Sequence, residues 1–191
     1  MELVVVTQGG CEVLEAELAT LLDRPDIHAV MLFISSECNV PPCQLSSLLQ
    51  NASKPIFGGL FPGIIHENRL LSHGAILVGF TSAVSVVVIP ELDENKIVQL
   101  EGRLVDELGL NDSKRQTLFT FVDGLSAHMN QLVQGLFNEF GLEINYIGGG
   151  CGNQALAPSP CVITPQGLLE SAAVLALADC SSSVGVAHGW Q

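Results

Sequence analysis

Hydrophobic residues in the first half of the chain fall into short continuous runs and into stripes with a helical period. The runs predict strands at residues 3–7, 29–34, 55–57 and 75–80. The stripes predict two helices, one through Leu14, Leu18, Leu21 and Leu22, and one after Pro41 and Pro42 through Leu45, Leu48 and Leu49. Two further apolar segments, 64–65 and 70–71, are separated by a bend at 66–68. The third strand runs into Gly58 and Gly59, where we expect a loop.

The second half repeats this order of patterns. Apolar runs predict strands at 84–89, 117–122, 145–147 and 172–178. Asp93 is a suitable N-cap for a helix that buries Ile97, Leu100, Leu104 and Leu108, and a second stripe predicts a helix over 129–140 that ends at Gly141. A hairpin-like region around 161–164 precedes the last long strand.

Short segments match between the halves. Residues 56–59 (Ile-Phe-Gly-Gly) correspond to 146–149 (Tyr-Ile-Gly-Gly), and 74–78 correspond to 172–176. These matches predict a β-α-β-α-β-β-β unit used twice, with halves at about 1–82 and 84–180 in one domain that spans 1–191. Residues 183–191 resemble the opening strand of another unit, so we expect them to start a missing C-terminal region.

The predicted fold class is α/β, with mixed sheets, helices on the outside and two pseudo-repeated halves. Strands with nearly continuous apolar runs are typical of sheets that are covered on both faces. Duplicated units with one apolar sheet face each are expected to pack those faces together. A four-layer α-β-β-α sandwich is therefore the favoured arrangement.

Composition narrows the classes of partner. The chain has seven Lys and Arg against twenty Asp and Glu, a net charge of −13, and 48% hydrophobic residues. Nucleic acid and anionic membrane surfaces are poor partners because binding phosphate requires clustered basic side chains. No apolar run reaches a membrane-spanning length and no signal peptide is recognisable, so we expect a cytoplasmic protein.

Five segments, in this order, resemble the FIST N-terminal domain: Phe-Ile-Ser-Ser (33–36), residues 55–64, Val-Asp-Gly-Leu-Ser (122–126), residues 146–153 and Ala-His-Gly-Trp (187–190). The resemblance implies a non-catalytic sensory domain of bacterial signalling proteins that binds a small, amino-acid-like ligand. It also implies a FIST C-terminal domain and a downstream signalling partner. Leu60 and Phe61 depart from the family pattern, which leaves open a more apolar ligand or a pocket that has lost its ligand.

We expect the ligand between the halves, at strand ends that carry polar or glycine residues. Asp123 would pair with an ammonium group, and backbone N–H groups of the glycine segments would bind a carboxylate. Phe61 follows a glycine turn and could line the pocket. The candidate ligand-binding residues are Ser35, Ser36, Gly58, Gly59, Phe61, Asp123, Gly124, Ser126, Gly149, Gly150 and Asn153.

Two alternatives remain open at this point. A hydrolase or transferase could use Cys38, Cys151 or a serine of the same segments, with His66, His73 or His188 as the base. A haem-based gas sensor is suggested by some relatives, and histidine is the ligand type that it needs. The chain carries neither a nucleophile-elbow motif nor a haem attachment motif, so the sequence predicts no catalytic residue, metal site or cofactor.

Overall fold

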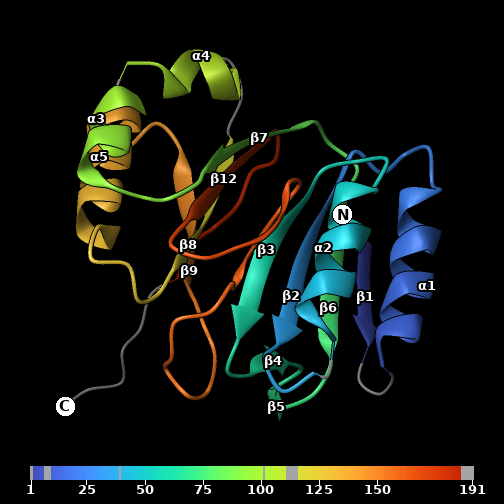
Figure 1. The fold of residues 1–191 in the computed structure, drawn as a ribbon. Coiled ribbons are helices and arrows are strands. Elements are labelled where there is room, and N and C mark those ends of the chain that lie inside the picture. The colour runs from blue at the N-terminus through green and yellow to red at the C-terminus, as the bar shows by residue number, and fades with distance from the viewer. Residues whose placement is uncertain (1, 7–9, 39, 101, 111–115, 186–191) are drawn as a thin grey trace.

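The computed structural model describes residues 2–6, 10–38, 40–100, 102–110 and 116–185 (Figure 1). One sheet has six strands in the order β1-β6-β2-β3-β10-β11. Their bounds are Glu2–Val6 (β1), Ala75–Phe80 (β6), Ala29–Ser35 (β2), Ile56–Phe61 (β3), Val162–Thr164 (β10) and Gly167–Leu169 (β11). We call it the first sheet. Its last two strands come from the second half of the chain.

The second sheet has four strands in the order β7-β12-β8-β9. Their bounds are Val84–Ile89 (β7), Ala173–Ala178 (β12), Thr117–Asp123 (β8) and Asn145–Cys151 (β9). In both sheets two adjacent strands that follow each other in the chain are parallel, β2 with β3 and β8 with β9, and the remaining pairs are antiparallel. Strands β4 (Ile64–His66) and β5 (Arg69–Leu71) form a separate hairpin.

Helices cover the outer face of each sheet. Helices α1 (Cys11–Leu22) and α2 (Pro42–Gln50) pack on the first sheet through buried leucines such as Leu14, Leu18, Leu45 and Leu49. Helices α3 (Glu94–Leu100), α4 (Leu104–Leu108) and α5 (Met129–Phe140) pack on the second sheet, where Leu132 and Leu136 are buried. Each helix presents one apolar stripe to its sheet, which explains why the leucine periodicity predicted it.

The inner faces of the two sheets share a third core. Phe57 and Phe80 of the first sheet lie beside Phe119 of the second, with ring centroids 6.3 Å apart for Phe57–Phe119 and 5.4 Å for Phe80–Phe119. Figure 1 shows α1 and α2 on one side of the sheets and α3 and α5 on the other. The predicted α/β class with mixed sheets is confirmed. Its description as a duplicated four-layer sandwich remains our interpretation of this arrangement.

Two details differ from the sequence-based expectation. The glycine segments were expected to be loops, but Gly58 and Gly59 lie within β3, and Gly149 and Gly150 lie within β9. The strands continue through these glycines, and at Gly58 the backbone of Leu32 occupies the space that a side chain would need. The helix expected through Ile97 and Leu108 is divided into α3 and α4, and Gly102 has a positive φ of 76° between them.

Within the described residues, no helix is both long and apolar enough to cross a membrane. The expected C-terminal region 183–191 is described only as far as residue 185, and residues 183–185 belong to no helix or strand. The Ala-His-Gly-Trp segment at 187–190 lies outside the described residues.

Candidate functional site

The carboxyl ends of β2 and β8 are held by matching backbone hydrogen bonds. Ser36 N–H donates to the Phe61 carbonyl at 2.7 Å, and Gly124 N–H donates to the Cys151 carbonyl at 2.8 Å. Each bond joins the residue after a central strand to the last residue of the parallel strand beside it. The predicted residues after β2 and β8 thus sit at corresponding strand ends, and these N–H groups are already used.

The polar side chains at these ends serve the backbone. The Asp123 carboxylate is buried and accepts hydrogen bonds from Leu125 N–H at 3.0 Å and Ser171 N–H at 2.8 Å. The Ser35 hydroxyl, also buried, donates to the Ser72 carbonyl. Ser126 accepts a hydrogen bond from His128 N–H at 3.2 Å. Asp123 and Ser35 therefore connect strand ends to the turns that precede β12 and β6.

The glycines of β3 and β9 allow close approach of backbone. A Cβ at Gly58 would lie 2.1 Å from the Leu32 carbonyl oxygen, and a Cβ at Gly148 would lie 1.8 Å from that of Thr120. The next residue along differs between the strands. A Cβ at Gly59 would lie 2.2 Å from Cys151 Sγ, whereas one at Gly149 would meet nothing within 4 Å. Open space therefore adjoins β9 where side chains fill the corresponding place beside β3.

The candidate residues Gly124, Gly150 and Asn153 come together in a small hollow of about 160 Å³, which we call the strand-end hollow. The Asn153 amide donates to the Ala157 carbonyl and to Ser159 Oγ, both at 2.8 Å, so it closes its own loop. Gly152 N–H donates to the Leu60 carbonyl at 2.8 Å. With these groups occupied, the strand-end hollow has little capacity to bind a carboxylate.

A larger pocket of about 520 Å³ lies between the two sheets, and we call it the inter-sheet pocket. Residues of both sheets, including the middle of β9, and residues of β4 form its wall. It is lined by Leu3, Met31, Phe33, Phe61, Ile64, Ile65, His66, Ile76, Val78, Phe119, Phe121, Ile147, Gly148 and Gly149. The rings of Phe61 and Phe121 both meet Phe33 edge to face, with centroids 5.6 Å and 5.5 Å away. The pocket is therefore apolar and rich in aromatic surface.

A second apolar cavity lies on the other side of β9, against α5. This cavity, the α5 groove, has a volume of about 400 Å³. Val133 and Phe137 of α5 line it and are 58% and 48% exposed. Gly148 and Gly149 line both the α5 groove and the inter-sheet pocket, so β9 has open apolar space on both faces.

A wide hollow of about 950 Å³ lies between the start of α1 and α2 and contains none of the candidate residues. It is a wide depression at the helical surface, and it borders Cys11 and Glu15. Burial and a hydrogen bond to Glu15 raise the pKa of the Cys11 thiol to about 11, so it is not a thiolate at neutral pH. We favour the inter-sheet pocket because apolar residues of both sheets line it.

The buried thiols beside the strand ends are poor nucleophiles. Burial raises the pKa of the Cys151 thiol well above 9.0, and burial together with Asp123 raises that of Cys161 to about 12. Both thiols are therefore protonated and poorly nucleophilic at neutral pH. The Ser36 hydroxyl is buried without a hydrogen-bond partner, and no described histidine ring is bonded to a serine or cysteine side chain.

The two histidines of the β4–β5 region, His66 and His73, have different surroundings. His66 lines the inter-sheet pocket, while the His73 ring is hydrogen-bonded to the Glu37 carbonyl at 2.9 Å. Among the described residues, no group of three or more His, Cys, Asp or Glu side chains is arranged to hold a metal ion.

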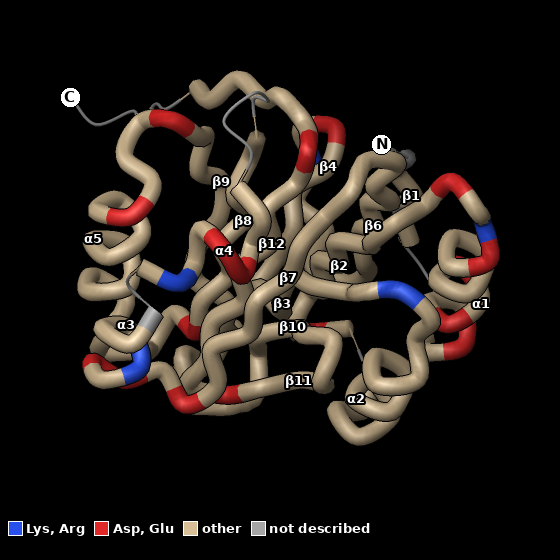
Figure 2. The backbone as a smooth tube through the Cα atoms, turned by 90° about the horizontal axis from the view of Figure 1, so that it is seen from above, with Lys and Arg blue, Asp and Glu red and all other residues tan. Residues whose placement is uncertain are grey.

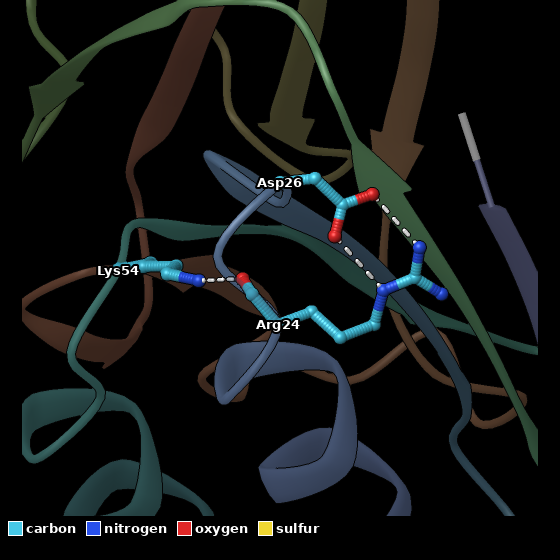
Figure 3. A network of polar contacts seen from close by, with 3 residues as sticks. All are labelled: Arg24, Asp26 and Lys54. Atoms are coloured by element: carbon cyan, nitrogen blue, oxygen red, sulfur yellow. Dashed lines mark hydrogen bonds and ion pairs between the residues drawn. The ribbon is translucent and has the colours of Figure 1, made fainter.

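Most charged residues lie in the helices and loops around the sheets, and acidic residues outnumber basic ones (Figure 2). Four of the described basic residues, Arg24, Lys54, Lys96 and Arg103, form local hydrogen bonds or ion pairs. Arg24 holds Asp26 through two hydrogen bonds of 3.1 Å and 2.8 Å, and Lys54 donates to the Arg24 carbonyl (Figure 3). This network fastens the connection between α1 and β2, and the described surface carries no cluster of free cations for a phosphate ligand.

The structure thus distributes the predicted site residues over several places. Phe61 and Gly149 line the inter-sheet pocket, and Gly124, Gly150 and Asn153 line the strand-end hollow. Gly58, Gly59, Ser35, Ser36, Asp123 and Ser126 border neither cavity. Sequence reasoning missed Ile64, Ile65 and Ile147 as pocket residues, although the isolated apolar pair at 64–65 before a bend was a signal that could have indicated them.

Comparison with known proteins agrees with the sequence resemblance. The model of the FIST N domain family matches residues 28–191, a segment that includes the central strands of both sheets. A search of curated proteins found no significant match. FIST domains are sensory domains in signal transduction. The chain belongs to the FIST N domain family.

Proposed function

We propose that this domain senses a small molecule with an apolar or aromatic body, which it binds in the inter-sheet pocket. One observation carries the proposal: an apolar cavity of about 520 Å³ lies between the two sheets and is lined by residues of both. Ligand pockets of this size are typically concave, mostly apolar and formed where structural layers meet. A ligand there contacts both sheets at once and can therefore influence how they are held together.

The lining indicates the chemistry of the ligand. Phe33, Phe61 and Phe121 present ring edges and faces that suit another aromatic ring or a branched aliphatic chain. His66 supplies a polar atom at the β4 side, where it can bond a hydroxyl or carboxylate group of the ligand. A molecule with one apolar body and one polar group fits this lining best.

The inter-sheet pocket suits the apolar side chain of an amino-acid-like ligand but not its ammonium group. Asp123, the expected partner for an ammonium group, is buried and satisfied by two backbone N–H groups. A free ammonium in the inter-sheet pocket would lose its hydration without gaining a carboxylate partner. Within this class, the proposal therefore favours amino acids with aromatic or large aliphatic side chains and their deaminated acids.

A thermal-shift screen tests the proposal. Phenylalanine, phenylpyruvate, leucine and indole are compared with aspartate, serine and lysine on the purified domain. At a concentration of hundredfold Kd, an apolar ligand should raise the Tm by about 5 °C or more. Phe61→Ala should abolish this shift, and Phe137→Ala, outside the pocket, should retain it. Stabilisation by the polar compounds alone would refute the proposed ligand class.

We further propose that the domain works in the cytoplasm and passes its signal to a FIST C-terminal domain and a downstream signalling partner. The six cysteines are free thiols, which suits a reducing compartment. The partner assignment rests on the family resemblance. Calorimetric titration of this chain with a FIST C-terminal domain, with and without the stabilising ligand, should show an affinity that changes with ligand.

A further inference from the structure

Two hairpins hold corresponding places in the two halves but differ in their pairing. The β10–β11 hairpin follows β9, and β10 pairs antiparallel with β3, with Val162 opposite Gly59 and Ile163 opposite Gly58. The β4–β5 hairpin follows β3 in the same way, yet among the described residues it pairs only with itself. An isolated two-stranded hairpin is marginally stable in water.

The apolar side chains of the two hairpins show the same difference. Ile163 and Leu168 are 0% and 8% exposed because they pack into the core beneath α2. Their counterparts in the first hairpin, Ile65 and Leu70, are 75% and 70% exposed. The β4–β5 hairpin therefore carries two large apolar side chains that lack the packing their counterparts have.

Strand β9 offers the edge that corresponds to β3. Within the described residues, β9 pairs only with β8, so the outer edge of β9 has no strand partner. The α5 groove lies on one face of this edge, where Ile163 and Leu168 fill the corresponding space beside β3. The inter-sheet pocket lies on the other face, and Ile64 and Ile65 already line it.

We propose that the β4–β5 hairpin is a strap that closes onto the edge of β9. The β3–β10 register places Ile64 opposite Gly149 and Ile65 opposite Gly148 in the closed state. Ile65 and Leu70 then enter the α5 groove and contact Val133 and Phe137. Closure pairs the free edge of β9 and buries apolar surface on both partners, as β10–β11 does on β3.

Closure of the strap also changes the inter-sheet pocket. The hairpin is fastened at both bases, by the Ser36–Phe61 backbone bond and by the Ser35 hydroxyl bond to Ser72, so the motion is confined to residues 62–71. Ile64 moves toward Gly149 and takes up pocket space. A ligand in the pocket therefore holds the strap open, a coupling that rests on the proposed function, whereas closure itself does not.

Disulfide trapping in the absence of ligand tests closure. The variant Ile64→Cys/Gly149→Cys places two thiols directly across the proposed pair, and a Cβ at Gly149 meets no other atom. The control Arg69→Cys/Gly149→Cys uses β5, the strand that lies away from β9 when the hairpin is closed. The three single variants Ile64→Cys, Arg69→Cys and Gly149→Cys account for disulfides with the native thiols.

We expect the Ile64–Gly149 pair to form an intramolecular disulfide about tenfold faster than the Arg69–Gly149 pair. Adding Leu70→Asp should slow trapping, because a carboxylate cannot enter the α5 groove, while Leu142→Asp outside the groove should not. Equal trapping of both pairs, trapping only between two molecules, or no trapping in the folded protein would overturn the proposal. A ligand-free domain that traps as expected but binds no compound of the screen would retain the strap and refute the proposed function.

Discussion

Gly58 and Gly148 hold corresponding positions in β3 and β9, and both lie against the carbonyl of the neighbouring central strand. Gly58→Ala and Gly148→Ala should each lower the free energy of unfolding by about 3 kcal/mol, because a methyl group must displace backbone. Urea unfolding measures this change. Gly149→Ala is the matched control and should stay within about 0.5 kcal/mol, since a Cβ there meets nothing within 4 Å. Equal losses at all three positions would contradict the contact-based explanation.

The individual cysteines should differ in how fast their thiols are alkylated. Cys43 is exposed, whereas Cys151 and Cys161 are buried and have raised pKa values. With iodoacetamide at pH 8, we expect Cys43 to be alkylated at least about a hundredfold faster than Cys151 or Cys161. Peptide mass spectrometry of timed samples measures the rates. Alkylation of Cys151 at the rate of Cys43 would show that the inner core opens readily.

The raised pKa of the Cys161 thiol predicts how the stability of the folded protein changes with pH. Its pKa is raised from 9.0 to about 12 in the folded state, so the folded protein keeps a proton that the unfolded chain releases near pH 9. This contribution is fully present below pH 9 and is lost as the pH rises toward about 12. Between pH 9 and 11, the Tm of Cys161→Ala should therefore fall less steeply than that of the unmodified protein. Parallel slopes would show that other groups govern alkaline unfolding.

At the residue scale, Phe61 lines the inter-sheet pocket, and its position after a glycine turn was the signal that suggested a pocket there. The role of Asp123 was not predictable in the same way. Its partner Ser171 is distant in the chain, and only the pairing of β8 with β12 brings the two together. From the sequence, we expected the Asp123 carboxylate to pair with an ammonium group of the ligand. A carboxylate can equally accept hydrogen bonds from backbone N–H groups, as it does here.

Among the elements, the turns after β8 and before β12 are joined through Asp123. Asp123→Ala should destabilise the domain by about 3 kcal/mol, because two buried N–H groups lose a charged acceptor. Asp106→Ala, exposed on α4, should change stability by less than about 0.5 kcal/mol. Chemical denaturation and the thermal-shift screen are run on both. If Asp123→Ala kept its stability but lost the ligand response, Asp123 would be a ligand-binding residue.

Most strands and helices were predictable because apolar runs and leucine stripes report burial directly. The stripe through Ile97 and Leu108 predicted one helix, but the stretch around Gly102 divides it, and the Gly102 N–H bonds to Glu139 of α5 at 2.9 Å. The two hairpins have similar apolar patterns, so the sequence does not distinguish the one that pairs with β3 from the one that pairs with itself. Whether a hairpin pairs with a sheet depends on which strand edge lies close to it in the folded protein.

On the scale of the whole molecule, the two halves depend on each other. The first sheet includes β10 and β11 from the second half, and Phe57 and Phe80 pack against Phe119 across the sheets. A fragment of residues 1–82 should therefore fail to fold alone, and its NMR spectrum should show little dispersion. The whole chain should unfold in one cooperative transition. A fragment with native-like dispersion would show that the first half has a self-sufficient core.

The overall class was predictable, because buried strands alternate with amphipathic helices, and the apolar composition requires covered sheets. The location of the inter-sheet pocket was not predictable from the sequence. Residues at strand ends were expected to form it, yet they are occupied by hydrogen bonds that hold the turns. The inter-sheet pocket instead arises where an edge strand lacks a neighbour, and this depends on tertiary pairing rather than on residue type.

The crossing of β10 onto β3 has a consequence for how the protein is made. During synthesis the first half leaves the ribosome with the edge of β3 unpaired, and its partner, residues 162–169, follows only after the segments between them have been made. Contacts between such distant segments form slowly, and unpaired strand edges invite association with other chains. We therefore expect the nascent first half to be more prone to association with other chains than the finished fold, in which β10 covers the edge of β3.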